Sequence, residues 1–502
     1  MELTFTDALI FFILVIGNVI FGASFIRKNK TSEQFTTGAG RIPGWAVGMS
    51  IFATFVSSIS FLGLPGKAYS SDWNAFVFSL SIPAASYAAV KFFIPLYREI
   101  GSVSAYYYLE LRFGAWARIY ASACYILTQL MRTGAILLLL ALPVNALFGW
   151  DVKTIIIITG LAVILYSMLG GIQAVIWTDT IQGLILIAGA LVCALFLMFS
   201  MPEGPGQLFR IAAASDKFSL GSFGTSLIDS TFWVVLFYGL FINLQNYGID
   251  QNYIQRYMAA GSNKAAKSSA IFGSLLYIPV SALFFFIGTS LFAYYTARPE
   301  LLPAHLQQPG TGDSVFPWFI ASGLPAGMTG LLIAAIFSAG MSTVSTSLNS
   351  TATIVLTDYY KRIFNGKAGE KESMLVLRIA STLTGITGVI IALLLVGVES
   401  VLDAWWALAS IFSGGMLGLF LLGYISRKAR KTDAVLGVIA GVIVIAWMSL
   451  SPLFFTEGKL LEFRSPFHAN LTIVFGTTVI FLTGFILSHL LSKKSKTVKK
   501  KT

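Results

Sequence analysis

The sequence predicts an all-α integral membrane protein with about thirteen transmembrane helices. Hydrophobic residues make up 56% of its 502 residues and charged residues only 11%, whereas soluble domains carry about 25% charged residues. Apolar runs of roughly 20 residues, the length that a helix needs to cross a bilayer, recur along the whole chain. They fall near residues 6–26, 44–64, 75–97, 117–147, 153–172, 174–198, 231–249, 269–294, 325–356, 375–397, 401–425, 433–452 and 468–491.

The loops between these runs predict the orientation of the chain. An odd number of spans places the two termini on opposite sides, and 25 loop Lys and Arg residues fall on the side of the C-terminus against 7 on the other side. Since basic residues concentrate in cytoplasmic loops, we expect the N-terminus outside and the C-terminus in the cytoplasm, in the cell (inner) membrane. The net charge of +12 and the basic tail then face anionic lipid, and we expect no nucleic-acid partner.

Two of the spans are interrupted by polar residues and glycine. The second contains Ser57, Ser58 and Ser60 followed by Gly63, Pro65 and Gly66, and the seventh contains Asn243, Gln245, Asn246 and Gly248. The two lie five spans apart, so corresponding halves of the chain would have opposite orientations. Interrupted helices in such positions are typical of inverted-repeat transporters, whose binding sites lie at the breaks. Two kinked packing helices are the alternative interpretation.

The ninth span carries an unusual number of hydroxyl groups. Ser338, Ser342, Ser345 and Asn349 share one helix face, and Thr343, Thr346 and Ser350 form an adjoining stripe. Hydroxyl groups in membrane helices often bond their own backbone or join helices. So dense a face favours oxygen ligands for a hard cation such as sodium, with carbonyl groups of the broken second span completing the shell.

Three ionisable residues, Lys91, Arg132 and Asp179, fall inside spans, where a charge is costly. Lys91 lies near a cytoplasmic end and can extend its ammonium group to the membrane surface. Asp179 could ligate a cation, and Arg132 could hold a substrate carboxylate with its two-pronged guanidinium. A structural ion pair between Arg132 and Asp179 is the alternative.

The same sequence excludes several other classes. It contains no phosphate-binding loop, and its three histidines are too scattered for a His-Glu-x-x-His metalloprotease site, so we expect no enzyme. Cys124 and Cys193 lie within apolar runs without metal-binding spacing, which predicts buried side chains and no disulfide. The first apolar run follows an acidic segment rather than a basic one, so we expect a retained helix. Coupling to an ion gradient remains as the energy source for transport.

Several motifs resemble the sodium:solute symporter family. They are Gly170–Gly183, Ser338–Ser350, Ala105–Phe113, Ile254–Tyr257 and Gly414–Phe420. The resemblance covers the whole chain and implies a leucine-transporter-type five-plus-five inverted repeat, with one helix before the core and two after it. This divides the chain into a leading helix (1–30), a first half that reaches the start of the second broken helix (40–250), a second half (229–428), two accessory helices (429–492) and the basic cytoplasmic tail (493–502).

Within this family the chain looks most like the bacterial sodium/sialic acid symporters. The resemblance implies a first sodium site of Ala53, Val56, Ala339, Ser342 and Thr343, and a second of Asp179, Ser342, Ser345 and Thr346. It implies substrate contacts at Ser57, Ser60 and Arg132. Phe78 and the amides of Asn243 and Asn246 are further candidates, since amides and hydroxyls suit a polyol. The chain departs from those symporters at Ala75 and Ser79, which stand for an aromatic residue and a glutamine, and at Phe55, which stands for a threonine.

These observations predict a sodium-coupled secondary symporter that imports a small polar organic solute, an acidic sugar such as sialic acid. The permanent charge of Arg132 would hold the carboxylate. A neutral sugar of the glucose or galactose type, a monocarboxylate and iodide remain alternatives, followed by a channel or a membrane sensor. The expected partners are the solute, sodium and membrane lipid; we expect a monomer and no cofactor apart from the coupling ion.

Overall fold

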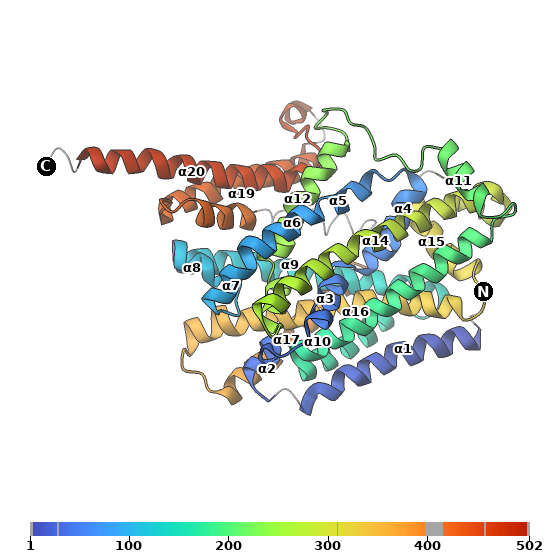
Figure 1. Ribbon diagram of the computed structural model, residues 1–502, viewed down its shortest axis with the longest axis horizontal. Helices are drawn as coiled ribbons and strands as arrows, with labels where there is room; N and C mark the ends of the chain where they lie inside the picture. The colour runs from blue at the N-terminus through green and yellow to red at the C-terminus, as the bar shows by residue number, and fades with distance from the viewer. Residues whose placement is uncertain (1–3, 28–29, 309, 397–414, 456–457, 499–502) are drawn as a thin grey trace.

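The fold is helical throughout the part of the chain that the computed structural model describes, which comprises residues 4–27, 30–308, 310–396, 415–455 and 458–498. Ten helices there are long and apolar enough to cross a membrane, and the bent pair α3–α4 makes an eleventh span. Figure 1 shows them running side by side in one elongated bundle.

The spans agree with the apolar runs of the sequence. One of them, residues 74–100, is built from short helical pieces, η3 (Asn74–Phe76), α5 (Val77–Leu80), α6 (Ile82–Ala88), η4 (Ala89–Phe93) and α7 (Ile94–Ile100). The other spans are α1 (Phe5–Ser24), α3 (Gly44–Phe55) with α4 (Ser58–Ser70), α9 (Ala115–Phe148), α10 (Val152–Phe199), α12 (Phe232–Ile249), α14 (Asn263–Ala297), α16 (Met328–Ile354) continued by η7 (Val355–Phe364), α17 (Glu370–Leu394), α19 (Lys431–Phe454) and α20 (Leu471–Val498).

Helix α10 combines two of the expected spans. Its 48 residues would extend ~72 Å if straight, more than twice the ~30 Å of a bilayer's hydrocarbon core. Gly171 interrupts the helix with φ 52° and ψ −158°, a conformation that glycine adopts without strain. A Cβ atom there would lie 2.9 Å from Phe35. The break therefore falls at the junction of the expected spans 153–172 and 174–198.

The expected span 401–425 lies largely outside the described residues, of which only the short apolar helix 415–425 belongs to it. The count of thirteen therefore stays a prediction. The short helices α2 (Ser32–Thr37), α8 (Tyr107–Phe113), α11 (Pro205–Ala214), α13 (Gln251–Ala259) and α15 (Gly312–Ser322) connect or flank the spans.

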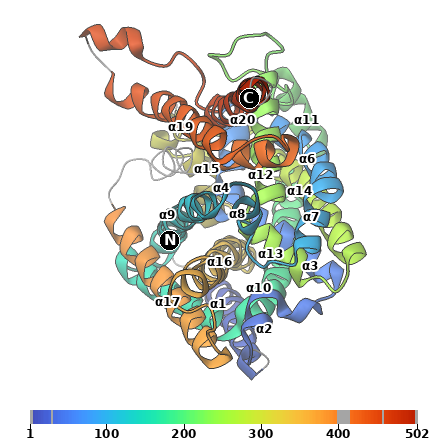
Figure 2. The same cartoon turned by 90° about the vertical axis from the view of Figure 1, so that its left-hand side faces the viewer.

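Helix α16 lies at the centre of the bundle. It contacts α1, α3, α4, α9, α10, α13 and α17, and Figure 2 shows α1, α9, α10, α13 and α17 around it. Nearly all of its residues are buried, so its many hydroxyl groups face protein rather than lipid. Helices α19 and α20 pack on each other at the edge of the bundle. The centre of the fold is thus where α16 meets both pieces of the first broken helix.

Candidate functional site

The first broken helix ends its first piece at Phe55. Val56 has extended backbone angles, and α4 begins at Ser58 with the hydroxyl of Ser57 as its N-cap, which accepts a hydrogen bond from the Ser60 amide at 3.4 Å. The two pieces are bent by 53°. The last carbonyl groups of α3, including that of Ala53, lose their helical amide partners at such an end and become available to a ligand. The predicted break is confirmed.

The second break lies slightly later than the sequence suggested. Asp250, with extended backbone angles, separates α12 from α13, and its carboxylate accepts a hydrogen bond from the Asn252 amide at 2.8 Å. Asn243 and Asn246 lie within α12. The side-chain amide of Asn243 donates to the hydroxyl of Ser81 at 3.0 Å and to the carbonyl of Phe78 at 3.4 Å, so it joins α12 to the α5–α6 segment.

The hydroxyl face of α16 meets a carboxylate. Asp179 of α10 is completely buried, and it accepts hydrogen bonds from Ser342 at 2.6 Å and from Ser50 of α3 at 2.5 Å. Other hydroxyls on the same helix bond their own backbone: Thr343 donates to Ala339 at 3.1 Å and Ser345 to Ser342 at 3.1 Å. The structure therefore brings Asp179 and Ser342 together directly, with Thr343 and Ser345 on the adjoining turns of α16.

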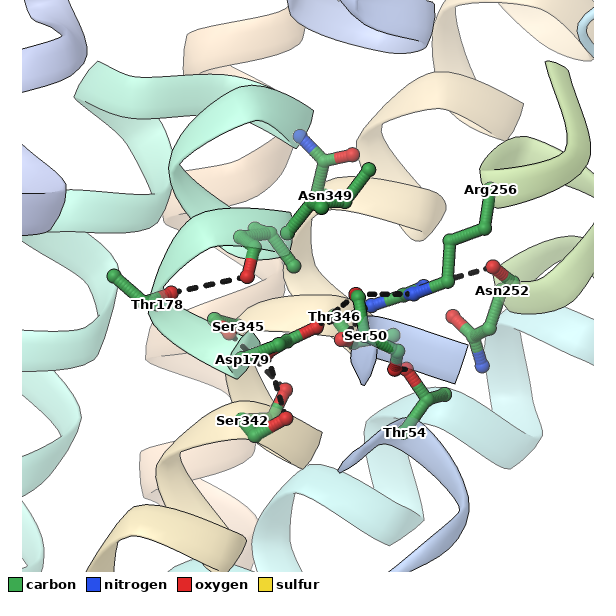
Figure 3. Close-up of polar contacts among 12 residues, drawn as sticks. Ser50, Thr54, Thr178, Asp179, Asn252, Arg256, Ser342, Ser345, Thr346 and Asn349 are labelled. Carbon is green, nitrogen blue, oxygen red and sulfur yellow. Dashed lines mark hydrogen bonds and ion pairs between the residues drawn. The ribbon is translucent and has the colours of Figure 1, made fainter. Parts of the chain in front are cut away.

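The partner of Asp179 is Arg256. Nη2 of Arg256 lies 2.8 Å from Asp179 and 2.7 Å from the hydroxyl of Thr346, and Nε donates to Ser50 at 2.7 Å. Both charged side chains are buried, with 1% or less of their surface exposed (Figure 3). The alternative of an ion pair between Arg132 and Asp179 is therefore wrong, because the carboxylate is already paired with another guanidinium.

Arg256 was missed because hydropathy places it in a loop. Helix α13 is polar in sequence, and Arg256 was counted among the cytoplasmic loop charges, yet α13 is buried and packs against α3, α12, α14 and α16. The signal that could have found it is its place six residues after Asp250, directly beyond an interrupted span. Charged residues there face protein rather than water.

Arg132 lies on α9 beside the first break. It is half-buried, and Nη2 lies 3.5 Å from the carbonyl oxygen of Thr54, one turn before the Ser57 cap. The positive charges of Arg132 and Arg256 both act on the carboxylate of Asp250. The guanidinium of Arg132 is therefore directed at the end of α3.

An aromatic cluster surrounds Phe55 at the same break. The Phe55 ring contacts Tyr277 edge-on with centroids 4.4 Å apart, stacks on Tyr247 at 5.5 Å and lies 6.2 Å from Phe78. Ser79, another position of departure, donates to the hydroxyl of Ser281 at 2.9 Å. The aromatic rings come from α3, α5, α12 and α14, so this part of the site is more apolar than the serines and amides alone indicated.

Comparison with known proteins identifies the family of the chain. The model of the sodium:solute symporter family matches residues 35–441. The chain belongs to the sodium:solute symporter family. It is 36% identical to the sodium/sialic acid symporter of Proteus mirabilis over 430 residues, which covers 85% of this chain and 86% of that relative. The symporter is therefore a multi-pass membrane transporter and not an enzyme.

Solved structures agree with this placement. A sodium-coupled sialic acid symporter in its substrate-bound outward-open state superposes with a TM-score of 0.89 at 33% identity, covering 97% of this chain and 98% of that one. The nucleobase–cation symporter Mhp1 in a closed conformation superposes with a TM-score of 0.57 at 15% identity, covering 91% of this chain and 95% of that one, and shares the fold. The symporter has the leucine-transporter-type fold that the family resemblance implied, and the two interrupted spans agree with its inverted repeat.

Proposed function

We propose that this symporter imports an acidic sugar, sialic acid, together with sodium ions. The observation that carries the proposal is Arg132, whose permanent positive charge lies beside the first helix break. It is 3.5 Å from the carbonyl of Thr54, which precedes the Ser57 cap by three residues. A guanidinium can bind a carboxylate through two parallel hydrogen bonds. The similarity to sialic acid symporters at 36% identity supports the same substrate class.

Two sodium sites would flank α16. The first would use the exposed carbonyls at the end of α3, those of Ala53 and Val56, with Ala339, Ser342 and Thr343 from α16. The second would use the Asp179 carboxylate with Ser342, Ser345 and Thr346. Hard cations prefer such oxygen ligands, and Asp179 supplies the negative charge that a buried cation needs.

The substrate would bind between the breaks. Arg132 would hold the carboxylate, Ser57 and Ser60 would bond the hydroxyl groups, and Phe78 and Asn246 would border the sugar. Asn243 already bonds Ser81 and Phe78, and its oxygen has no hydrogen-bond partner among the described residues, so it would contribute this acceptor.

The surrounding assignments complete the proposal. The halves 40–250 and 229–428 would form the inverted repeat around the substrate, preceded by one helix and followed by two accessory helices and the cytoplasmic tail. The protein would work as a monomer in the inner membrane, with its N-terminus outside and its solute released into the cytoplasm.

Uptake into proteoliposomes tests the proposal. Vesicles without internal sodium receive labelled sialic acid with external sodium chloride or, as a control, choline chloride. Sodium-dependent accumulation above the external concentration is the expected result. Uptake that persists after the gradient is collapsed would indicate a channel, and the absence of any sodium response would overturn the proposal.

Phe55 favours a second candidate. Its ring fills space beside the Ser57 cap and packs on Tyr277 and Tyr247, which leaves less room for a polyol tail than a threonine would. A short monocarboxylate needs the guanidinium and an apolar wall but no polyol contacts. Competition of labelled uptake by unlabelled sialic acid and by pyruvate or propionate separates the two substrates.

A further inference from the structure

Four charged side chains lie near the two helix breaks, and their charges balance. Asp179 and Arg256 are paired and buried, while Asp250 and Arg132 are half-buried at the two helix breaks. They alternate in sign from the proposed second sodium site to the proposed substrate site. An unpaired charge in a membrane interior is costly. The charge of one added cation or anion must therefore be compensated, either by a rearrangement of these side chains or by binding of the other ligand.

Arg256 occupies the place that a cation at the second site requires. Its Nη2 atom lies 2.8 Å from the carboxylate of Asp179 and 2.7 Å from the hydroxyl of Thr346, two of the groups proposed to ligate sodium. A sodium ion bound by both of these oxygens would need the position that the Nη2 atom now occupies. One carboxylate would also face two positive charges, so the guanidinium must withdraw when sodium binds.

Asp250 is a carboxylate linked to Arg256 through Asn252, and it offers an acceptor to the displaced guanidinium. Nη1 of Arg256 already donates to the carbonyl of Asn252 at 2.8 Å, and the amide of Asn252 donates to Asp250 at 2.8 Å (Figure 3 shows Arg256 with Asn252). The charge of Arg256 also acts on the Asp250 carboxylate in this structure. The displaced guanidinium would move along this hydrogen-bonded chain toward Asp250.

Arg132 completes the sequence of charges. Its Nη2 atom lies 3.5 Å from the Thr54 carbonyl, and Arg132 forms no ion pair with Asp250 within 4.0 Å. Its attraction to Asp250 therefore acts at longer range, and the approach of the Arg256 guanidinium to the same carboxylate weakens it. With Asp250 neutralised by Arg256, Arg132 is left without an anionic partner in this group, and a substrate carboxylate then supplies one. When one sodium ion and one substrate carboxylate bind together, the net charge of the two ligands and the four side chains remains zero.

We propose that sodium at Asp179 displaces Arg256 toward Asp250, and that this exchange releases Arg132 to bind the substrate carboxylate. This inference rests on the proposed second sodium site and extends the proposed function, because it explains how sodium binding favours substrate binding. Arg256 is a positioning residue in this account: it touches neither the solute nor, once displaced, the ion.

The first measurement uses sodium alone. Thermal unfolding of the purified full chain is followed while sodium chloride replaces choline chloride at constant ionic strength, for the parent and for Arg256→Gln. Removing the competing guanidinium should lower the sodium concentration for half-maximal stabilisation by about tenfold, within the 5–150-fold range of coupled sites. An unchanged or higher concentration would overturn the displacement.

The second measurement tests the coupling. The dissociation constant of sialic acid is measured with and without sodium, and the ratio of the two values gives the coupling. We expect a ratio of about tenfold or more in the parent and a ratio close to one in both Arg256→Gln and Asp250→Asn. A ratio that persists in both variants would contradict the exchange of partners.

Two further variants control for folding and for loss of an arginine. Arg98→Gln removes a guanidinium that donates to the carbonyls of Tyr257 and Ala260 at the end of α13, and it should keep the parental sodium response. If Arg256→Gln does not fold, Arg256→Lys replaces it. A lysine cannot bond Asp179, Thr346 and Ser50 from fixed positions, so its sodium requirement should fall below that of the parent, and an unchanged value would overturn the inference.

These measurements separate the inference from the proposed function. If the parent is stabilised by sodium but binds no sialic acid, the proposed substrate is wrong, and the sodium titration of Arg256→Gln still decides the displacement. If both ligands bind the parent and Arg256→Gln leaves the sodium titration and the coupling ratio unchanged, symport stands and the exchange is wrong.

Discussion

Asp7 holds the start of the central helix through Gly330. The carboxylate of Asp7, in the first turn of α1, accepts hydrogen bonds from the amides of Gly330 and Gly327, both at 2.8 Å, at the N-terminus of α16. A carboxylate there satisfies amides without helical partners and interacts favourably with the helix dipole. Helix α1 thus fixes the position of the helix that carries the proposed sodium ligands.

Replacing Asp7 should therefore weaken both stability and sodium binding. Loss of a helix cap costs about 0.5–2 kcal/mol, so Asp7→Ala should lower the unfolding temperature and raise the sodium concentration for half-maximal uptake. Thermal unfolding and sodium-dependent uptake measure the two effects. Asp151→Ala, which removes the cap at the start of α10 where Asp151 accepts from Thr154, is the control. An equal change in sodium response in both variants would contradict a specific role for Asp7.

Removing the hydroxyl of Ser342 should impair sodium binding. Ser342 donates to Asp179 at 2.6 Å and belongs to both proposed sodium sites, so Ser342→Ala should raise the sodium concentration for half-maximal uptake by about tenfold, which corresponds to ~1.4 kcal/mol. Asp179→Asn should affect the second ion more than the first.

Ser347→Ala is the matched control for Ser342→Ala. Ser347 is equally buried on α16 but donates to Gln129 of α9 at 2.7 Å, so its loss should leave the sodium response unchanged. Sodium titrations of uptake measure all three variants. A Hill coefficient for sodium near one in the parent would contradict two sites.

The charge of Arg132 should determine whether a carboxylated solute binds. A hydrogen bond to a charged group contributes about 1.5–3 kcal/mol, so Arg132→Ala should weaken sialic acid binding by at least tenfold and leave the methyl ester of sialic acid unaffected. Arg132→Lys should retain part of the affinity. Equilibrium competition with labelled sialic acid measures each value, and equal losses for the acid and its ester would make Arg132 structural.

An ion-pair network at one end of the bundle should make the stability of the protein depend on pH through Glu110. The carboxylate of Glu110 pairs with Arg362 of η7 at 2.5 Å and with Arg118 of α9 at 2.8 Å. The hydrogen bond from Arg362 and then that from Arg118 lower the pKa of Glu110 from 4.5 to about 2. A lowered pKa means that the folded state favours the ionised form, so this contribution is present above the unfolded pKa and disappears as the pH falls from there through the folded pKa.

Glu110→Gln removes the titrating group, so its unfolding temperature should fall less than that of the parent between about pH 6 and pH 3. Glu203→Gln is the control, because Glu203 pairs with Arg210 while both side chains are more than 60% exposed, and an exposed pair contributes little. Parallel pH profiles for the parent and Glu110→Gln would contradict the prediction.

The sequence identified the helices and residues of the site better than it identified which side chains contact each other there. Ser57 marked the first break because serine caps a helix, whereas Gly63 lies within α4. Asn243 did not mark the second break, since its amide finds partners in Ser81 and Phe78 and the helix continues to Ile249. The pairing of Asp179 with Arg256 depends on the packing of α13 against α3 and α16, a long-range contact that local hydropathy does not encode.

Phe55 should restrict which solutes the site accepts. Its ring packs on Tyr277 and Tyr247 next to the Ser57 cap, at a position that the sequence resemblance assigns to a threonine in the sialic acid symporters. Phe55→Thr removes that ring, so it should bind sialic acid more tightly while unfolding at a lower temperature. Phe55 is partly buried, and truncating an aromatic residue in the core costs up to about 3–5 kcal/mol.

The matched control for this prediction is Phe61→Thr. Phe61 of α4 is fully buried against Phe284 and Phe316, with centroids 5.1 and 5.9 Å apart, so it loses similar packing energy without altering the wall beside Ser57. Dissociation constants for sialic acid and for a short monocarboxylate, with unfolding temperatures, are measured for both variants. Since destabilisation alone cannot raise affinity for one solute, tighter binding of sialic acid in Phe55→Thr and not in Phe61→Thr would make the ring a determinant of substrate size. Equal affinities in the parent and Phe55→Thr would place the solute away from this aromatic cluster.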